Sequence, residues 1–154
     1  MQYTLQLGHA LPNLIGKLQT NKVRFAVQIF DYIHSVDSKK IAKKIADEQS
    51  KINKKIKIFL QVNIGDEDQK SGIKKNDIDK LISYCREINL DLIGLMCIPP
   101  ANIDPEHYFR EMKQLNKNFD FKELSMGMSS DYIKAAKNLS TYVRIGSSIF
   151  GKRF

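Results

Sequence analysis

Short apolar runs alternate with amphipathic stretches along the 154-residue chain. In the amphipathic stretches, apolar residues recur at the three- and four-residue spacing of a helix. Six such strand-plus-helix units in succession predict an α/β fold with a parallel sheet. No linker or internal repeat interrupts the pattern, so residues 1–154 are predicted to form a single domain. The predicted strands are residues 14–16, 33–36, 56–64, 92–98, 124–128 and 142–145.

Polar residues mark the predicted helix starts. Asp37-Ser38 and Asp77 each precede an apolar stripe, and Asp104-Pro105 places a capping residue before a first-turn proline. Ser129-Ser130-Asp131 precedes the fifth predicted helix in the same way. Each of these polar residues is therefore expected to mark the start of a helix.

The two faces of the clearest strand differ in polarity. Even positions of residues 58–64 are all apolar, whereas the odd positions change from Phe59 to Gln61 and Asn63. The last strand repeats this, with Arg144 on the face opposite to valine and isoleucine. Because side chains alternate along a strand, the pattern favours a barrel whose polar mouth lies at the strand C-termini. The alternative is that Gln61 and Asn63 are hydrogen-bonded amides of the core.

Glycine and serine follow both of the last two strands. Ser129 and Ser130 come after one, and Gly146 and Ser147 come after the other. Backbone N–H groups and hydroxyls at a helix start suit an anion, and the last loops of α/β barrels commonly bind phosphate. The pair of loops therefore predicts a phosphate-bearing ligand. The alternative is that the serines cap helices and Gly146 makes a turn.

Charge and composition exclude several classes of protein. The net charge is +8, from 25 Lys and Arg against 17 Asp and Glu, but the lysines are dispersed and arginine is scarce. A basic nucleic-acid-binding protein is thus an alternative without a supporting motif. No apolar run reaches the ~20 residues of a membrane span. The cysteines Cys85 and Cys97 are interpreted as reduced packing residues, and we expect a cytoplasmic location.

Metal chemistry has little support. The residues His9, His34 and His107 have no zinc-ligand spacing with the cysteines. The acidic loop 65–72 lacks the spacing of a calcium-binding EF-hand, so it is interpreted as a solvated loop at the mouth.

Seven segments, in order, carry a resemblance to a known family. The chain resembles the pyridoxal 5′-phosphate (PLP) homeostasis protein family, also called the proline synthetase co-transcribed family, from about Leu14 to Arg153. The matching segments are Ile15-Gly-Lys-Leu-Gln-Thr-Asn-Lys22, Ile33-His-Ser-Val-Asp37, Gln61-Val-Asn63, Lys70-Ser-Gly72, Gly94-Leu-Met-Cys-Ile-Pro99, Leu124-Ser-Met-Gly-Met-Ser129 and Val143-Arg-Ile-Gly-Ser-Ser-Ile-Phe-Gly151.

The resemblance implies a TIM-type (β/α)8 barrel similar to the alanine racemase N-terminal domain, with PLP at its mouth. Arg144 would lie near the pyridine nitrogen and keep it unprotonated. The resemblance implies a protein that stores, delivers or buffers PLP. Family members have no robust turnover reaction, so no catalytic residue is assigned. PLP is the expected ligand, the chain is expected to be a monomer, and no specific nucleic-acid partner is expected. The implied cofactor-binding residues are Asn63, Met128, Ser129, Arg144, Gly146 and Ser147.

Two family segments have no counterpart here. The Schiff-base lysine of the family stands in a Val-Ser-Lys context at the end of the first strand, and a Phe-Gly-Glu-Asn-Tyr-type segment follows on the second. We therefore expect a barrel that lacks the first two β/α units and binds PLP less well. Residues 3–7 alternate like one strand and are expected to cover part of the gap.

Three further expectations follow from the comparison with the family pattern. Asn13 stands where many members carry histidine. Lys22 or Lys70 could in principle replace the missing lysine, and the simpler alternative is that both are solvated lysines of a loop or a helix. A PLP-dependent amino-acid racemase is the catalytic alternative, and it requires both that lysine and an opposing acid or base.

Overall fold

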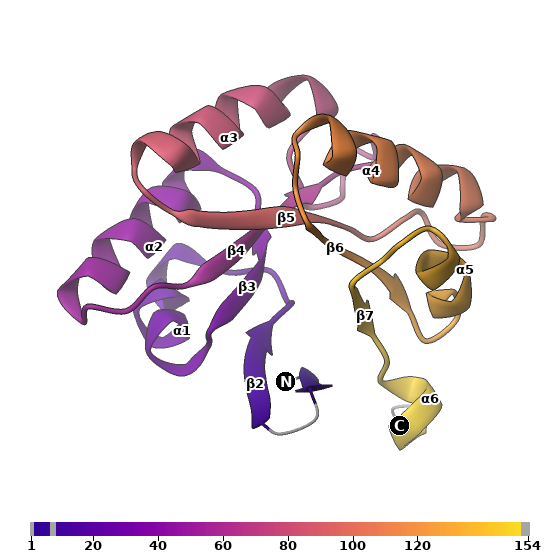
Figure 1. The fold of residues 1–154 in the computed structure, drawn as a ribbon, viewed down its shortest axis with the longest axis horizontal. Helices are drawn as coiled ribbons and strands as arrows, with labels where there is room; N and C mark the ends of the chain where they lie inside the picture. Colours follow the sequence, from indigo (N-terminus) through magenta and orange to yellow (C-terminus); the bar gives the residue numbers. More distant parts are fainter. Residues whose placement is uncertain (1, 7–8, 152–154) are drawn as a thin grey trace.

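Seven strands form one sheet in the computed structural model, which describes residues 2–6 and 9–151. The strands are hydrogen-bonded in chain order, with the first pair antiparallel and all later pairs parallel (Figure 1). The strands are β1 (Gln2–Gln6), β2 (His9–Leu14), β3 (Tyr32–Val36), β4 (Lys57–Val62), β5 (Asp91–Cys97), β6 (Glu123–Met128) and β7 (Tyr142–Arg144).

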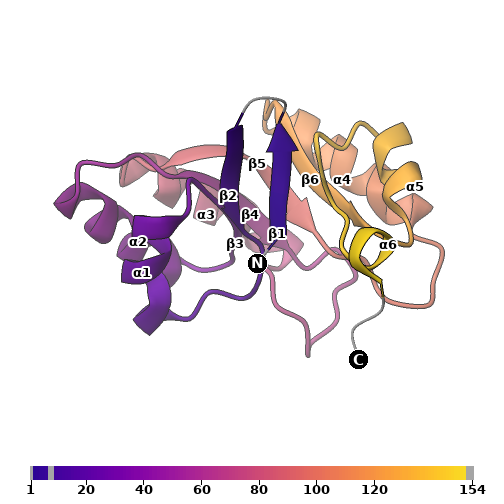
Figure 2. The same ribbon diagram turned by 90° about the horizontal axis from the view of Figure 1, so that it is seen from below.

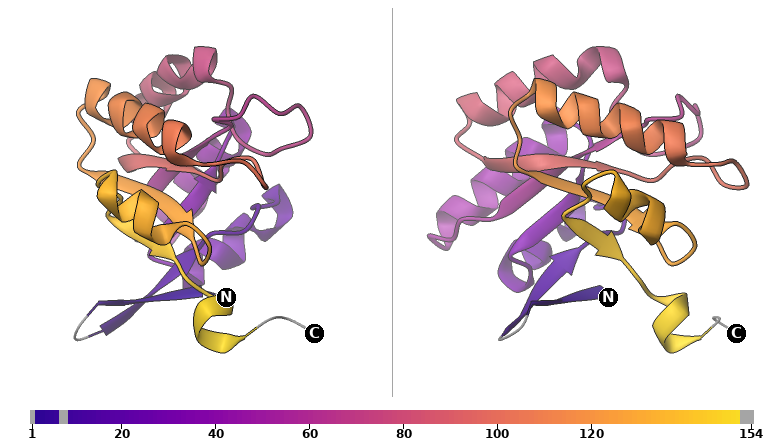
Figure 3. Two further views of the ribbon diagram at one scale, coloured as in Figure 1. Left: turned by 90° about the vertical axis from the view of Figure 1, so that its right-hand side faces the viewer. Right: turned by 45° about the vertical axis from the view of Figure 1, so that its right-hand side comes forward.

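Helices connect the parallel strands and follow the outside of the curved sheet (Figures 1 and 3). Short 3₁₀ turns, η1 (Thr20–Lys22) and η2 (Lys75–Asp77), lead into two of them. The helices are α1 (Val23–Ile29), α2 (Lys39–Lys51), α3 (Ile78–Glu87), α4 (Glu106–Asn118), α5 (Tyr132–Lys137) and α6 (Ser147–Phe150). This one-sided covering leaves the inner face of the sheet to line the interior of the curve.

The sheet curls until its two ends approach each other. Strand β1 lies between β2 and the C-terminal α6 in Figure 2, and Cα atoms of β1 and β7 come within 8 Å. The hydrogen-bonded order nevertheless ends at β1 and β7. The fold is thus a half-barrel of six parallel strands with one antiparallel strand at its open edge.

The predicted strand parity is confirmed. The side chains of Ile58 and Leu60 on β4 belong to the aliphatic cluster between sheet and helices. Phe59 belongs to a separate inner cluster with Tyr32 and Met96, against which Tyr142 packs. The sheet therefore separates a large, mainly aliphatic outer layer from a small inner cluster rich in aromatic rings.

Several predicted helix starts are confirmed by capping contacts. Ser38 Oγ accepts a hydrogen bond from Ile41 N at 3.5 Å, and Asp104 Oδ1 accepts one from Glu106 N at 3.2 Å. The start after Ser129-Ser130-Asp131 is also confirmed, because residues 129–131 form a turn, Asp131 is the N-cap residue and α5 begins at Tyr132. This turn frees the Ser129 side chain for the contacts described below.

The first parallel strand was predicted too late in the chain. It occupies His9–Leu14, and its last two residues pair with Tyr32 and Ile33 of β3. Residues 9–13 include polar residues and a proline, so no apolar run indicated this strand. The predicted strand over residues 3–7 is found at Gln2–Gln6, and residue 7 lies outside the described residues.

The expected TIM-type barrel is therefore confirmed in its fold class, and the absence of two β/α units of a complete (β/α)8 barrel stays a prediction. The observed strand count is six parallel strands plus β1. Within residues 2–6 and 9–151, no helix is long and apolar enough to cross a membrane.

Candidate functional site

The two serine- and glycine-containing loops meet at the C-terminal edge of the sheet. Ser129 Oγ accepts hydrogen bonds from Gly146 N at 3.0 Å and from Ser148 N at 3.4 Å. Ser148 Oγ returns a hydrogen bond to the Ser129 carbonyl at 3.3 Å. Two backbone N–H groups thus point at one oxygen, which is the arrangement that an anion requires. Ser147 is the exposed first residue of α6 beside them.

Close packing of α5 on β6 fixes the position of this turn. Gly127 has φ +94°, and a Cβ at that position would lie 2.6 Å from Ala135 Cβ. Only glycine fits such a conformation and such a contact. Asp131 Oδ1 then accepts a hydrogen bond from Met128 N at 2.6 Å, which ties the start of the turn to the end of β6.

Arg144 lies on the inner face of β7 and is 2% exposed. Its Nη2 donates to the Cys97 carbonyl at 2.7 Å, and its Nη1 donates to Ser125 Oγ at 2.8 Å. Its Nε donates to Met128 Sδ at 3.3 Å. A guanidinium has five N–H groups, and three of them have these partners among the described residues. Arg144 is thus a fixed cation with N–H donors to offer a ligand.

His34 and Ser125 join this site, although the sequence did not indicate them as site residues. His34 Nδ1 lies 2.9 Å from Ser125 Oγ, and His34 Nε2 lies 3.0 Å from Asn13 Oδ1. The three side chains are at most 2% exposed. The alternation of β3 is the signal that could have found His34, because it shares the face of Tyr32.

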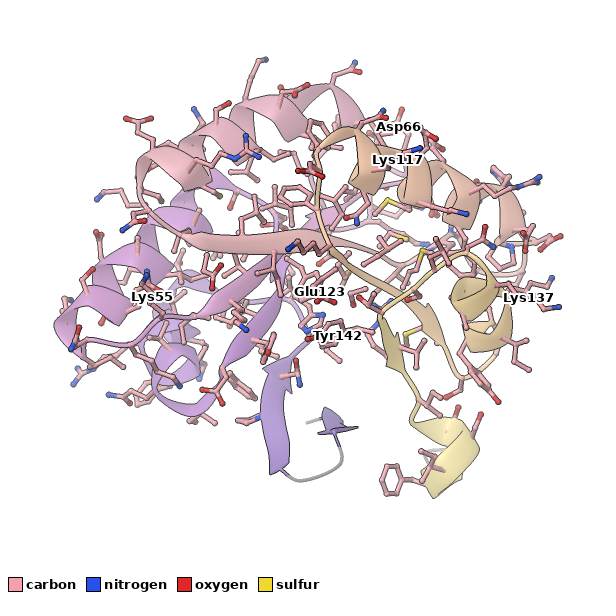
Figure 4. All side chains as sticks on the ribbon, viewed as in Figure 1. Lys55, Asp66, Lys117, Glu123, Lys137 and Tyr142 are labelled. Atoms are coloured by element: carbon pink, nitrogen blue, oxygen red, sulfur yellow. The ribbon has the colours of Figure 1, made fainter. Side chains whose placement is uncertain are left out.

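Aromatic rings surround the imidazole of His34. The ring stacks on Phe59 with centroids 4.2 Å apart and meets Tyr142 edge-on at 5.4 Å. Tyr142 also meets Phe59 edge-on at 5.2 Å and lies 5.8 Å from Tyr32. In Figure 4, Tyr142 lies near the centre of the view, beside β7. On the inner face, aromatic rings thus pack closely around the imidazole of His34, which is hydrogen-bonded to Asn13 and Ser125.

Burial controls ionisation at this site. Burial, with the nearby charge of Arg144, lowers the pKa of His34 from 6.5 to about 3, so the ring is neutral. Burial also lowers the pKa of Arg144, and it raises the pKa of Tyr142. The thiol of Cys97 has its pKa raised by burial to about 12, so Cys97 contributes its carbonyl and remains a thiol.

Asn63 and Gln61 hold a loop. Asn63 Nδ2 donates to the Glu67 carbonyl at 2.8 Å, and Asn63 Oδ1 accepts from Glu67 N at 3.2 Å. Gln61 Nε2 donates to the Ser71 carbonyl at 3.2 Å. These contacts match the alternative in which both are hydrogen-bonded amides, and the role of Asn63 beside PLP stays a prediction.

The two candidate lysines each follow a parallel strand, Lys70 in the loop after β4 and Lys22 in η1 after β2. Lys70 Nζ pairs with Glu67 at 2.7 Å and donates to the Pro99 carbonyl at 3.3 Å. Lys22 is exposed at the end of η1. The structure thus brings together Ser129, Gly146, Met128 and Arg144, whereas Asn63 serves a neighbouring loop.

Sequence comparison places the chain among known proteins. The family model described as "Alanine racemase, N-terminal domain" matches residues 6–153. The pyridoxal phosphate homeostasis protein of Aquifex aeolicus is 37% identical over 151 residues, which cover 92% of this chain and 66% of that protein. The Pasteurella multocida protein of the same name is 36% identical over 165 residues, covering 99% and 71%. The chain therefore spans about two thirds of the length of these relatives.

Solved structures agree with the fold. PipY of Synechococcus elongatus PCC7942, solved with PLP bound, superposes with a TM-score of 0.86 at 30% identity, covering 94% of this chain and 72% of PipY. An alanine racemase of Clostridium difficile 630 has a TM-score of 0.72 at 15% identity, covering 95% and 41%, which supports the fold alone. With the match to the curated relatives, these findings show that the chain belongs to the pyridoxal phosphate homeostasis protein family, within the wider family of alanine racemase N-terminal domains.

Proposed function

We propose that this chain binds PLP at the ends of β6 and β7 and takes part in PLP homeostasis in the cytoplasm. Its relatives are named for PLP homeostasis and not for a reaction, and PipY was solved with PLP bound. The proposal covers storage and delivery of PLP by a monomer, without a specific nucleic-acid partner. The two buried, free thiols of Cys85 and Cys97 fit a reducing compartment.

One observation carries the proposal: a buried cation and a cluster of anion-directed N–H groups lie at the end of the same strand. Arg144 is the last residue of β7, and Gly146 follows two residues later. Both groups are therefore anchored on the same short stretch of chain at the end of β7. PLP carries its phosphate on an arm that extends away from the ring and so keeps it apart from the pyridine nitrogen, which fits a site with these two ends.

The phosphate end is formed by the turn after β6 and the start of α6. Gly146 N and Ser148 N converge on Ser129 Oγ. We propose that these N–H groups and the hydroxyls of Ser129 and Ser147 donate to the phosphate oxygens. Hydrogen bonds to an ionised acceptor are roughly twice as strong as neutral ones, so this end supplies most of the affinity.

Arg144 forms the pyridine end. Its guanidinium carries its charge at all ordinary pH values and cannot accept a proton, so a pyridine nitrogen facing it is held unprotonated. When bound, PLP supplies an aldehyde that reacts with amines, and an unprotonated ring is a weak electron sink. Arg144 thus favours holding PLP over chemistry on it, which suits homeostasis better than racemisation.

Titration of the purified 154-residue chain tests this function. PLP is expected to bind saturably, and pyridoxal, which lacks the phosphate, to bind at least tenfold more weakly. A Ser50→Ala variant is the control, because Ser50 is exposed on α2, away from β6 and β7, and its hydroxyl donates to the Ala46 carbonyl of the same helix. Equal affinity for PLP and pyridoxal would refute the phosphate end of the site.

The mode of attachment needs a second experiment. Borohydride reduction in the presence of PLP, followed by intact mass and peptide mapping, detects a lysine adduct. One stoichiometric adduct would identify the attached lysine and test Lys22 and Lys70 directly. Absence of an adduct with saturable binding would mean that PLP is held by the phosphate and pyridine ends alone.

A further inference from the structure

Four buried polar side chains form a row across the inner face of the half-barrel. They are Asn13 on β2, His34 on β3, Ser125 on β6 and Arg144 on β7, each at most 2% exposed. The strands are far apart in sequence, so the curl of the sheet is what brings them together. Only Arg144 has a role in the proposed function, and the other three are unexplained by it.

The chemistry of the end groups sets the direction of every hydrogen bond in the row. Asn13 Oδ1 can only accept, so His34 Nε2, 3.0 Å away, carries the proton. In a neutral ring, Nδ1 then accepts, and its partner at 2.9 Å is the Ser125 hydroxyl. Ser125 Oγ uses its proton on His34 and keeps lone pairs for Arg144 Nη1, which donates at 2.8 Å.

A doubly protonated His34 is disfavoured by the nearby positive charge of Arg144. A protonated His34 would donate from both nitrogens, so Ser125 Oγ would receive donors from two cations in a buried site. Burial and the charge of Arg144 lower the pKa of His34 to about 3, which agrees with a neutral ring. The stacked Phe59 and the edge-on Tyr142 fix the plane of that ring.

We propose that Asn13, His34 and Ser125 are positioning residues for Arg144: they form a one-way hydrogen-bond relay, with His34 as its Nε2–H tautomer, that holds the guanidinium in place. The part of this inference that concerns PLP rests on the proposed function. In that site, the relay sets where the cation faces the pyridine nitrogen. His34 acts by accepting from Ser125, which directs the lone pairs of Ser125 to Arg144.

The tautomer of His34 tests the relay without any ligand. In 15N-histidine NMR spectra of the unchanged chain, His34 is expected as the neutral Nε2–H form between pH 5 and pH 8. Its signal is identified by its loss in His34→Gln, with His107→Gln at an exposed histidine as the control. An Nδ1–H tautomer, or a doubly protonated ring at pH 7, would overturn the proposal.

Removal of the Ser125 hydroxyl tests whether the hydrogen bond from Arg144 to Ser125 keeps the guanidinium in place. In Ser125→Ala, guanidinium proton exchange at Arg144 is expected to become at least fivefold faster. Ser125→Thr keeps a hydroxyl and should restore slow exchange, and Ser50→Ala should have no effect. Unchanged exchange in folded Ser125→Ala would overturn the relay, whether or not the chain binds PLP.

A separate measurement tests whether the relay positions Arg144 against bound PLP. With pyridine-15N-labelled PLP, Ser125→Ala is expected to shift the nitrogen resonance and to weaken binding about fivefold, while Ser125→Thr resembles the wild type. An identical resonance and affinity in Ser125→Ala would refute positioning at the cofactor. If the wild type binds no PLP, the proposed function fails, and the tautomer and exchange measurements still decide the relay.

Discussion

The outer and inner faces of the seven-stranded sheet differ in chemistry and in role. The outer face packs aliphatic side chains such as Ile58 and Leu60 against the helices. The inner face carries a stack of rings and the relay that ends at Arg144. Apolar packing is non-directional, whereas each inner polar group has a specified partner. The outer face therefore stabilises the fold, and the inner face defines the site.

The largest expected effect is on the outer face. Ile58 is fully buried between sheet and helices, so Ile58→Ala removes buried methyl groups and leaves a cavity. We expect the free energy of unfolding to fall by about 3 kcal/mol, measured by urea denaturation. PLP affinity of the folded fraction should stay within twofold of the wild type. A selective loss of PLP affinity would contradict the division between the faces.

Arg144→Ala tests the inner face. It removes the cation and leaves Ser125 Oγ and the Cys97 carbonyl without their donor. Hydrogen bonds to charged groups contribute about 1.5–3 kcal/mol, so PLP affinity should fall at least tenfold in a direct titration. Arg144→Lys retains the charge, and its PLP affinity is expected to lie between those of the wild type and Arg144→Ala. Wild-type affinity in Arg144→Ala would place the cofactor elsewhere.

Acid should destabilise the inner face through His34. Its folded pKa is about 3 against 6.5 for an exposed histidine, so the unfolded chain binds the extra proton first as pH falls. Stability from this group is therefore complete above pH 6.5 and decreases toward pH 3, by about 2 kcal/mol at pH 5. His34→Gln should lose that much less stability between pH 7 and pH 5 in urea denaturation. Equal losses in both proteins would mean that His34 is not neutral and buried.

Ser129→Ala has the smallest expected effect. It removes the oxygen that receives Gly146 N and Ser148 N but leaves both N–H groups available to a phosphate. PLP affinity should fall by about 1 kcal/mol, or roughly fivefold, while affinity for pyridoxal stays constant. A matched loss for pyridoxal would show that Ser129 does not serve the phosphate.

The local parts of the fold could be predicted from the sequence, and the contacts across the sheet could not. Strand parity at residues 58–64 and the serine–glycine loops at Ser129 and Gly146 depend on local alternation and turn chemistry, and the structure brings them together as predicted. His34 and Ser125 are 91 residues apart, so their contact depends on the curl of the whole sheet. The bounds of β2 could not be predicted correctly because polar residues and a proline interrupt this strand at the edge of the parallel strands.

The most direct test of the central claim is a PLP titration of the 154-residue chain beside an Arg144→Ala, Ser129→Ala double variant. Both proteins must first give the same far-ultraviolet circular dichroism, so that folding is matched. We predict saturable binding of one PLP per wild-type chain and a loss of at least fiftyfold in PLP affinity in the double variant. Saturable binding of equal affinity in both proteins, or none in the wild type, would contradict a PLP site at the ends of β6 and β7.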